Sequence, residues 1–334
     1  NRDVKDYLRE IFSLVVDHWG FTVLKLDFLY AAAINPEEGK LRGKLMSEAM
    51  DFIYSCTRGA KILGCGVPLG TVFNKIDYCR VGSDVALIWE DHRLKLLRYK
   101  ERVSTINSIT NTLYRSPLNN LFFLNDPDVY ILREENQKMS WEQRKSLFLI
   151  NQIFGNLLLT SDDPSNYGKE SLNLYLSQFP CRNKKINSFI IEDGLLSVSF
   201  NLVNEISKEE HFLKMFSNLT GGTKKLFLDL GFWYKEETIF QGPQEIHLLP
   251  YQSHCFKSLD PEKPLSVLTP HLFPGSDVDF AILDNNKIIY SISEKSRSIG
   301  RVRIVVSKPG TYLLQDLPQE TRIEEGLPVL DFPG

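Results

Sequence analysis

The chain has 334 residues, long enough to bury a large core and to form two domains. Hydrophobic residues make up 43% of it and charged residues 24%, and a net charge of −3 without a dense basic run argues against a nucleic-acid partner. The longest apolar stretch, near residues 147–159, is interrupted by three amide side chains, so no membrane-spanning segment is expected and the predicted partner is a small molecule or a glycan.

The cysteine and histidine patterns exclude two common kinds of structural site. Five cysteines are present, an odd number without a C-x-x-C pair, which argues against a disulfide framework and a zinc site. The six histidines show no ligand spacing, so no metal or other cofactor is required. We therefore expect a reducing, cytoplasmic location. The first residue is Asn1 rather than Met, without a signal-peptide pattern, so the chain is expected to begin partway through a longer protein.

The first predicted element is an amphipathic helix over residues 2–18, which has apolar side chains at helical spacing. Gly20 separates it from a predicted buried strand within residues 21–30. Residues two positions apart in a strand face the same way, so Lys25 and Asp27 would share one face. The pair is either a salt bridge at a strand end or an ionised carboxylate available as a nucleophile or ligand anchor.

Helices and strands are predicted to alternate up to about residue 178. The predicted strands cover residues 62–66, 76–81, 121–124 and 157–160, and the predicted helices cover residues 41–57, 89–113 and 140–154. Ser140 and Gln143 have the spacing of a capping box at the start of the last helix. Alternation of this kind indicates a parallel sheet, and polar residues follow each strand, as at the functional edge of such sheets. Without a glycine-rich phosphate loop, a (β/α)8 TIM barrel is favoured over a doubly wound sheet.

Beyond about residue 178 the pattern changes to short β-rich runs between turn residues. The predicted strands there cover residues 195–202, 225–230, 246–249, 278–283, 287–292, 302–306 and 311–314. Their period-two alternation predicts an antiparallel β-sandwich-like domain. The expected domains are therefore residues 1–178, part of a catalytic barrel, and residues 179–334, a β-rich domain without a catalytic constellation.

Four motifs, in order and at plausible spacing, resemble those of the retaining α-galactosidases of glycoside hydrolase family 36. They are KLDF at residues 25–28, LGCGVP at 63–68, RVGSD at 80–84 and NDPD at 125–128. Each motif alone is weak, but the ordered set is specific. The resemblance covers residues 1–178 well and the remainder loosely.

The resemblance implies a pair of catalytic carboxylates. Asp27 matches the nucleophile of the family and Asp84 matches its acid/base. A retaining glycosidase needs two carboxyl groups about 5–5.5 Å apart, one ionised to attack the anomeric carbon and one protonated to release the aglycone. A proline usually precedes the acid/base, and Ser83 takes its place here, which changes the stiffness of the loop without removing the acid.

The resemblance also implies four substrate-binding residues. Lys25 and Arg80 match residues that hold sugar hydroxyls, and Cys65 and Gly66 match the cysteine–glycine turn of the family. If Asp84 is to act as an acid, Arg80 is expected to serve the sugar rather than to pair with Asp84.

Two other pairs of carboxylates have ordinary structural explanations. Asp126 and Asp128 flank a proline and are expected to form a turn that supports the site. Asp162 and Asp163 are expected to cap a following helix.

The resemblance implies a retaining exo-α-galactosidase that hydrolyses terminal α-galactosides of the melibiose or raffinose type by double displacement. An α-N-acetylgalactosaminidase or a galactosyl transferase on the same scaffold remains open. So does a function outside catalysis, as a truncated product or an assembly subunit.

By family order, the strand that carries Asp27 is the fourth of eight. The chain would then supply barrel strands four to eight, and the N-terminal half of the same enzyme would supply strands one to three. Without those strands the sheet would have an open edge and an unfilled interior. The expected partners are this N-terminal half and an α-galactoside oligosaccharide, with homo-oligomer formation left open.

Overall fold

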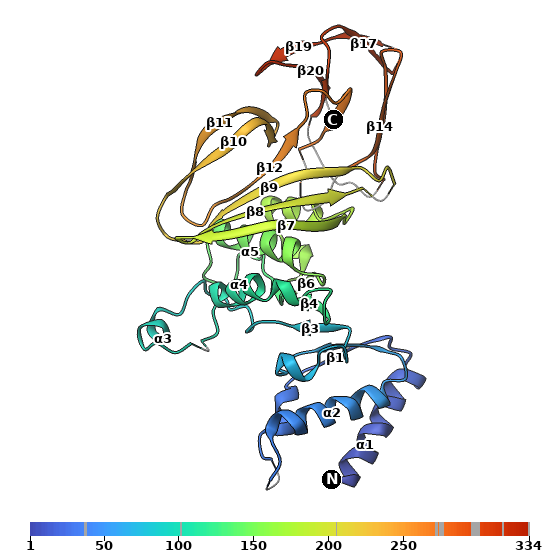
Figure 1. The fold of residues 1–334 in the computed structure, drawn as a ribbon, viewed down its shortest axis with the longest axis vertical. Helices are drawn as coiled ribbons and strands as arrows, with labels where there is room; N and C mark the ends of the chain where they lie inside the picture. The colour runs from blue at the N-terminus through green and yellow to red at the C-terminus, as the bar shows by residue number, and fades with distance from the viewer. Residues whose placement is uncertain are drawn as a thin grey trace. The chain divides into compact units, whose positions relative to one another are not determined.

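The computed structural model describes residues 1–36, 39–100, 102–204, 206–270, 273, 277–294, 301–315 and 317–332. The chain divides into two compact units (Figure 1). The first, called the α/β unit, comprises Asn1–Tyr130 and Ile150–Ser161, and the second, called the β-rich unit, comprises Ile131–Leu149 and Asp162–Gly334. The expected domain boundary at residue 178 stays a prediction.

The α/β unit is built on parallel strands that neighbour one another in chain order. One sheet has the order β1-β2-β3-β4, and a second consists of β5 and β6. The strands are β1 (Val23–Leu26), β2 (Lys61–Gly64), β3 (Tyr78–Arg80), β4 (Leu124–Asp126), β5 (Val129–Tyr130) and β6 (Leu159–Thr160). The strand predicted at residues 121–124 therefore begins three residues later, as β4. Pro127 and Asp128 separate β4 from the next strand, β5.

Helices connect the strands of the α/β unit, as the alternating pattern predicts. The helical segments are the α-helices α1 (Arg2–Ser13), α2 (Arg42–Cys56), α3 (His92–Leu96) and α4 (Thr105–Tyr114), the π-helix η1 (Leu14–His18), and the 3₁₀-helices η2 (Leu29–Ala33), η3 (Leu69–Thr71) and η4 (Ser116–Leu118). A further helix, α5 (Trp141–Phe154), contributes residues to both units. In Figure 1, α1 and α2 lie beside β1 at the blue end of the chain.

The prediction of one helix over residues 89–113 is wrong, because α3 and α4 are separate. The Asp91 side chain accepts hydrogen bonds from the backbone at the start of α3. The Ser104 side chain accepts one from Asn107 N at the start of α4. Each of these side chains satisfies a backbone N–H that a helix start leaves unpaired, so the segment contains two helix beginnings.

The residues of β1 alternate between the core and the opposite face of the sheet. Leu24 packs in a buried cluster with Phe12 of α1 and Cys56 of α2, and Leu26 lies against the same cluster. Lys25, which lies between these leucines, is exposed. The predicted period of two therefore holds along this strand.

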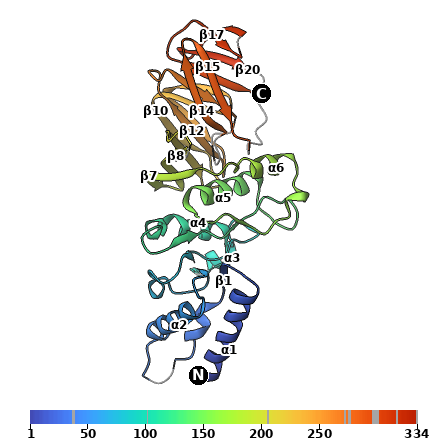
Figure 2. The same cartoon turned by 90° about the vertical axis from the view of Figure 1, so that its right-hand side faces the viewer.

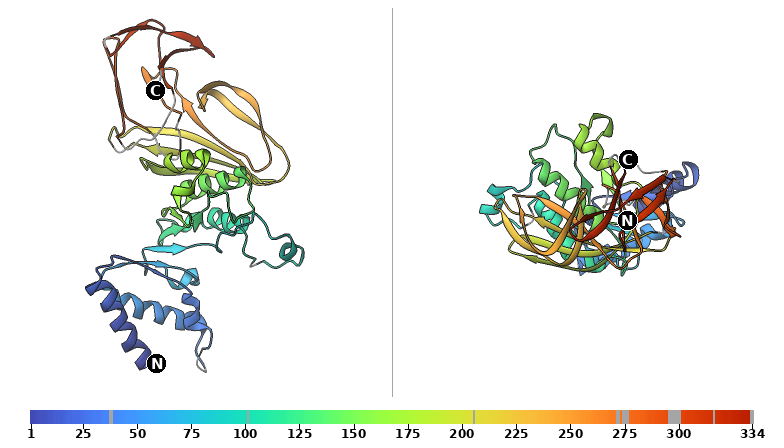
Figure 3. Two further views of the ribbon diagram at one scale, coloured as in Figure 1. Left: turned by 180° about the vertical axis from the view of Figure 1, so that it is seen from behind. Right: turned by 90° about the horizontal axis from the view of Figure 1, so that it is seen from above.

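The β-rich unit contains three sheets. A six-stranded antiparallel sheet has the order β11-β10-β12-β9-β8-β7, and two four-stranded sheets have the orders β13-β16-β20-β19 and β14-β15-β17-β18. The strands are β7 (Asn183–Glu192), β8 (Leu195–Val203), β9 (Glu210–Asn218), β10 (Lys224–Lys235), β11 (Thr238–Leu248), β12 (Ser253–Leu259), β13 (Leu265–Leu268), β14 (Val278–Asp284), β15 (Lys287–Ile292), β16 (Val302–Val306), β17 (Thr311–Leu314), β18 (Leu317–Glu320), β19 (Arg322–Glu324) and β20 (Leu327–Phe332). Figure 2 shows β14, β15 and β17 together at the red end, and Figure 3 shows the yellow-to-orange β10–β11 hairpin from behind.

The two four-stranded sheets share an apolar core. Buried Leu265 and Ile304 from one sheet lie in the same cluster as Ile288 and Tyr312 from the other. This arrangement agrees with the predicted β-sandwich-like packing of antiparallel strands. One pair departs from the prediction, since β15 and β17 are parallel.

Two predicted caps are present in the β-rich unit. Ser140 Oγ accepts a hydrogen bond from Gln143 N, and Gln143 Oε1 accepts one from Ser140 N, which forms the capping box at the start of α5. Asp163 accepts a hydrogen bond from Ser165 N at the start of the 3₁₀-helix η5 (Pro164–Asn166), which precedes α6 (Lys169–Leu176). Asp162 does not cap a helix but pairs with Arg133 at 2.8 Å.

Within the described part of the chain, no helix is long and apolar enough to cross a membrane. All five cysteines are free. Cys56, Cys65 and Cys79 are buried, Cys255 is partly buried and Cys181 is exposed.

Candidate active site

Lys25 and Asp27 lie at the carboxyl end of β1, and both are exposed. Asp27 Oδ1 accepts a hydrogen bond from the following backbone N–H, that of Phe28, at 2.7 Å. Among the described residues, the Lys25 ammonium forms neither a hydrogen bond nor an ion pair. Lys25 and Asp27 therefore do not form the local salt bridge that was one of the two expectations. Both charged groups are available to a ligand.

The backbone beyond β1 runs beside the cysteine–glycine turn that follows β2. Cys65 N donates to Leu26 O at 2.8 Å, and Tyr30 N donates to Gly66 O at 2.7 Å. Gly66 has a φ of +61°, and a Cβ built on it would lie 3.2 Å from the Tyr30 ring. Glycine therefore permits both the turn and its close approach to the segment that carries Asp27.

The thiol of Cys65 is affected by burial and by four charged side chains. Burial raises the pKa of its thiol to about 11, and further contributions come from Arg80 and Lys25, which lower it, and from Asp126 and Asp27, which raise it. These four charged groups therefore contribute to the electrostatic environment of the buried sulfur. The strand order places four of the six residues implied by the motifs at or just after the carboxyl ends of β1, β2 and β3, namely Lys25, Asp27, Cys65 and Arg80.

Arg80 is the buried centre of an ion-pair cluster. It ends β3 directly opposite Asp126 of β4, and its Nε lies 2.8 Å from Asp126 Oδ2. Its Nη2 lies 2.7 Å from Asp128 Oδ1, without the alignment of a hydrogen bond. Burial alone would lower the pKa of Arg80, but Asp126 and Asp128 together raise it. The guanidinium is therefore held as a cation by two buried carboxylates.

Asp84 lies on the loop after β3, and its side chain is 77% exposed. The expectation that Arg80 would not pair with Asp84 is wrong, because Arg80 Nη1 lies 3.1 Å from Asp84 Oδ1. Asp126 and Asp128 already balance the Arg80 charge, so this third contact leaves little net positive charge near Asp84. Asp27 and Asp84 follow parallel strands of one sheet, so both lie at its carboxyl edge.

Asp128 anchors the loop that carries Asp84. Its Oδ2 accepts a hydrogen bond from Val85 N at 2.7 Å, and its own N–H donates to Asp126 Oδ1 at 2.9 Å. Burial raises the pKa of Asp128. The turn predicted at residues 125–128 is wrong in form, since Asn125 and Asp126 belong to β4, but a supporting role for the two carboxylates agrees with these contacts.

The loop before Asp84 lies close to α4. A Cβ at Gly82 would lie 3.0 Å from the Asn111 Cβ, so a larger residue at position 82 would push the loop away from the helix. Ser83, which replaces the usual proline, has a buried Oγ without a hydrogen-bond partner among the described residues. Sequence reasoning did not predict the closeness of Gly82 to Asn111, because it depends on a helix more than 20 residues further along the chain.

The described residues contain no cluster of three or more histidine, cysteine, aspartate or glutamate side chains that could hold a metal ion. The charged groups of this edge form pairs with one another or face outward. Two carboxylates, Asp27 and Asp84, and the Lys25 ammonium lie at the carboxyl edge of a parallel sheet. The buried ion pairs of Arg80 with Asp126 and Asp128 lie at the ends of the neighbouring strands. Such a set can bind hydroxyl groups and can carry out nucleophilic and acid–base chemistry.

No family model matches the chain. Among solved structures, it is similar to the α-galactosidase of Thermus thermophilus in complex with p-nitrophenyl α-D-galactopyranoside, with 27% identity, a TM-score of 0.51, and coverage of 63% of this chain and 40% of that one. With the same enzyme in complex with stachyose, the values are 30% identity, a TM-score of 0.46, and coverage of 52% and 37%. A protein of Bacteroides fragilis described as an α-galactosidase/melibiase shares the fold, with 16% identity, a TM-score of 0.56, and coverage of 75% and 57%.

The resemblance to α-galactosidases that the motifs indicate is therefore confirmed by the structural similarity. The chain spans about 37–57% of the length of these three similar structures.

Proposed function

We propose that the chain is the C-terminal part of a retaining exo-α-galactosidase. The observation that supports the proposal is the order of the motif residues along one parallel sheet. Consecutive strands of this sheet lead to Lys25 and Asp27, to Cys65 and Gly66, and to the segment from Arg80 to Asp84. The similar Thermus enzyme is an α-galactosidase with bound galactosides. The substrates proposed for this chain are terminal α-galactosides of the melibiose or raffinose type.

In the first proposed step, an Asp27 carboxylate oxygen attacks the anomeric carbon and the bond to the aglycone oxygen breaks. The leaving oxygen takes a proton from Asp84, and a galactosyl ester remains on Asp27. In the second step, Asp84 removes a proton from a water molecule, which attacks the anomeric carbon and releases Asp27. Two displacements at one carbon return the original configuration.

Lys25 and the Arg80 cluster have different proposed roles. Lys25, whose ammonium is unpaired among the described residues, donates to sugar hydroxyls. Arg80 is held by Asp126 and Asp128, so it acts mainly by positioning the Asp84 loop. This assignment differs from the direct sugar contact that the resemblance implies.

The barrel is proposed to be completed by strands outside this chain. Within the described residues, β1 has a hydrogen-bonded neighbour only on its β2 side. Apolar side chains near that edge are exposed, with Trp19 at 62%, Phe21 at 55% and Val23 at 50%. Burial of such side chains contributes about 1.5–3 kcal/mol each, so a covering segment would stabilise this edge considerably. The proposed partner is the N-terminal half of the same enzyme, which supplies barrel strands one to three.

The test is to purify the chain gently from its native source and to identify co-purifying polypeptides by mass spectrometry. The purified assembly is then given p-nitrophenyl α-D-galactopyranoside, and NMR records the anomeric form of the first galactose released. Release of the α-anomer first is the expected result. Release of the β-anomer first would exclude retention, and substrate binding without hydrolysis would favour a non-catalytic subunit.

Expression of residues 1–334 alone tests the incomplete barrel. We expect an aggregated or inactive product, with activity restored by co-expression of an N-terminal fragment that carries the missing strands. A soluble monomer that melts cooperatively and has full activity would contradict the incomplete barrel without contradicting the α-galactosidase activity.

A further inference from the structure

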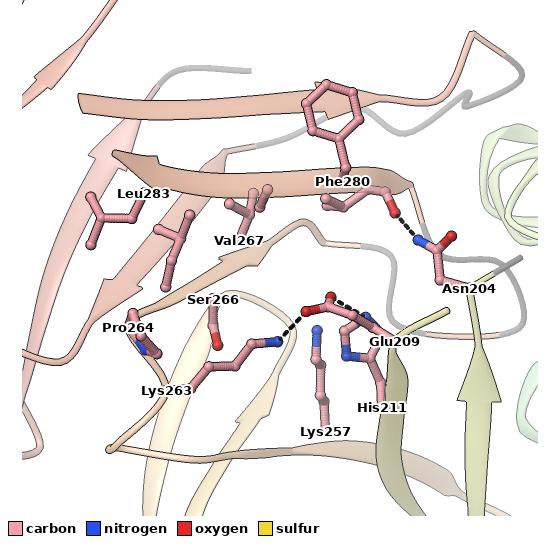
Figure 4. Close-up of a pocket in the computed structure, with 13 residues that line it drawn as sticks. Asn204, Glu209, His211, Lys257, Lys263, Pro264, Ser266, Val267, Phe280 and Leu283 are labelled. Atoms are coloured by element: carbon pink, nitrogen blue, oxygen red, sulfur yellow. Dashed lines mark hydrogen bonds and ion pairs between the residues drawn. The ribbon is translucent and has the colours of Figure 1, made fainter. Parts of the chain in front are cut away.

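The β-rich unit contains a cavity that the proposed catalytic site does not use (Figure 4). Its volume is about 270 Å³, close to the lower end of the range of about 300–1,000 Å³ that is common for small-molecule sites. Strands β9 and β12 of the six-stranded sheet contribute His211 and Lys257, and β13 and β14 contribute the opposite wall. The cavity therefore lies where the sheets of this unit diverge.

One end of the cavity is positively charged. Lys263 Nζ pairs with Glu209 Oε1 at 3.0 Å. Lys257 lines the same end, and its ammonium makes no hydrogen bond or ion pair with the described residues. The nearby Lys257 charge and burial lower the pKa of His211 to about 2, so its imidazole is neutral at pH 7. The two lysines and the glutamate thus leave one positive charge without compensation.

The surroundings of Lys257 disfavour the charged form of its side chain. Burial and then the nearby Lys263 charge lower its pKa to about 8, although the nearby Glu209 carboxylate acts in the opposite direction. An anion beside Lys257 would offset both effects, because the single Glu209 carboxylate is paired with Lys263 and does not balance two lysines. A single negative charge is enough to balance this end of the cavity.

The opposite wall is apolar. Val267 of β13 and three residues of β14, namely Val278, Ala281 and Leu283, line it. In Figure 4 the labelled Val267 and Leu283 lie across the cavity from Lys257 and Lys263. A ligand that fits both walls has a charged head and a compact apolar body.

We propose that this cavity binds a small organic monocarboxylate, with its carboxylate on Lys257 and Lys263 and its apolar body against Val267 and Leu283. The single charge favours a carboxylate over a phosphate dianion, which would leave one negative charge in excess. The site is independent of the proposed galactosidase chemistry.

Calorimetric titration of the complete assembly that contains this chain with benzoate tests the proposal, with benzyl alcohol as the neutral analogue and inorganic phosphate as the alternative anion. Benzoate is expected to bind, and Lys257→Met, which keeps most of the aliphatic stem, is expected to weaken its binding about 10- to 100-fold. The matched control is Lys308→Met, at an exposed lysine outside the cavity, with an expected change of less than about twofold. Equal binding of benzoate by both variants, or of benzyl alcohol and benzoate by the unaltered chain, would overturn the proposal.

A second measurement covers the case in which Lys257→Met fails to fold. The complete assembly with the unaltered chain is acylated with acetic anhydride, and mass spectrometry follows the modification of Lys257 and Lys308. Benzoate is expected to slow acylation of Lys257 at least about tenfold and to leave Lys308 unaffected. Equal acylation of Lys257 with and without benzoate would exclude the site, and stronger protection by inorganic phosphate would exclude the carboxylate class.

Discussion

Arg80 and Asp126 are directly opposite each other on neighbouring parallel strands, and their charged atoms meet at 2.8 Å with both side chains almost fully buried. This pair joins β3 to β4 from positions 46 residues apart in the sequence. Because Asp128 shares the same guanidinium and also holds the backbone of Val85, the pair positions the loop of the proposed acid/base.

Arg80→Met is expected to destabilise the protein by about 3–5 kcal/mol, because it leaves the Asp126 carboxylate buried without a counter-charge. Urea unfolding at pH 7 measures the change. Arg42→Met, at an exposed arginine of α2 without a described ion pair, is the control and should alter stability by less than about 0.5 kcal/mol. Equal midpoints for the two variants would show that the buried pair contributes little.

Asp27→Asn is expected to lower turnover of an activated aryl α-galactoside at least about 10³-fold in the complete assembly, because an amide cannot form the glycosyl ester. Substrate binding should survive. The measurement combines steady-state kinetics with equilibrium binding, and Asp3→Asn on the exposed face of α1 is the control. Near-normal turnover would remove Asp27 from the role of nucleophile.

Asp84→Ala is expected to reduce hydrolysis of melibiose at least about 10²-fold more than hydrolysis of a p-nitrophenyl galactoside, because acid assistance matters most for a basic leaving oxygen. Initial rates on the two substrates give the comparison. Equal losses on both would place the general acid at another residue.

Glu90→Gln is expected to destabilise the protein by about 1–3 kcal/mol at pH 7. Glu90 lies 2.8 Å from Arg102 Nε and 3.2 Å from Lys95 Nζ, with its side chain 6% exposed. The hydrogen bond from Arg102 lowers the pKa of Glu90 to about 2 from 4.5.

Because the folded-state pKa is depressed, the Glu90 contribution is fully present above about pH 4.5 and is lost as the pH falls toward 2. Thermal unfolding of Glu90→Gln and the unaltered protein should therefore converge in acid. The exposed Glu48→Gln should match the unaltered protein throughout. A stability difference that persists at pH 2 would point to lost packing rather than lost charge.

Local signals predicted those features that depend on neighbours in the sequence. The alternation of Lys25 and Asp27 with Leu24 and Leu26 predicted which face of β1 is polar, and that face is exposed. The capping box of Ser140 and Gln143 requires only four consecutive residues, so it was readable without the fold.

Features that depend on distant partners were not predictable in the same way. Aspartates beside a proline ordinarily form turns, yet Asp126 lies in β4 because Arg80 compensates its buried charge. The two helix starts at Asp91 and Ser104 are local signals by contrast, and they were missed because the apolar spacing over residues 89–113 fits one helix. The contact of Arg80 with Asp84 depends on a loop conformation that Asp128 holds from another strand.

The buried position of Cys65 also determines how the protein can be labelled with thiol reagents. Thiolates, not thiols, react with alkylating agents, and a pKa raised to about 11 keeps Cys65 protonated near neutral pH. Cys79, with its pKa raised to about 12, is equally inert. Cys181 is exposed in the β-rich unit, so it should accept a fluorophore while the cysteines nearest the candidate site stay unmodified.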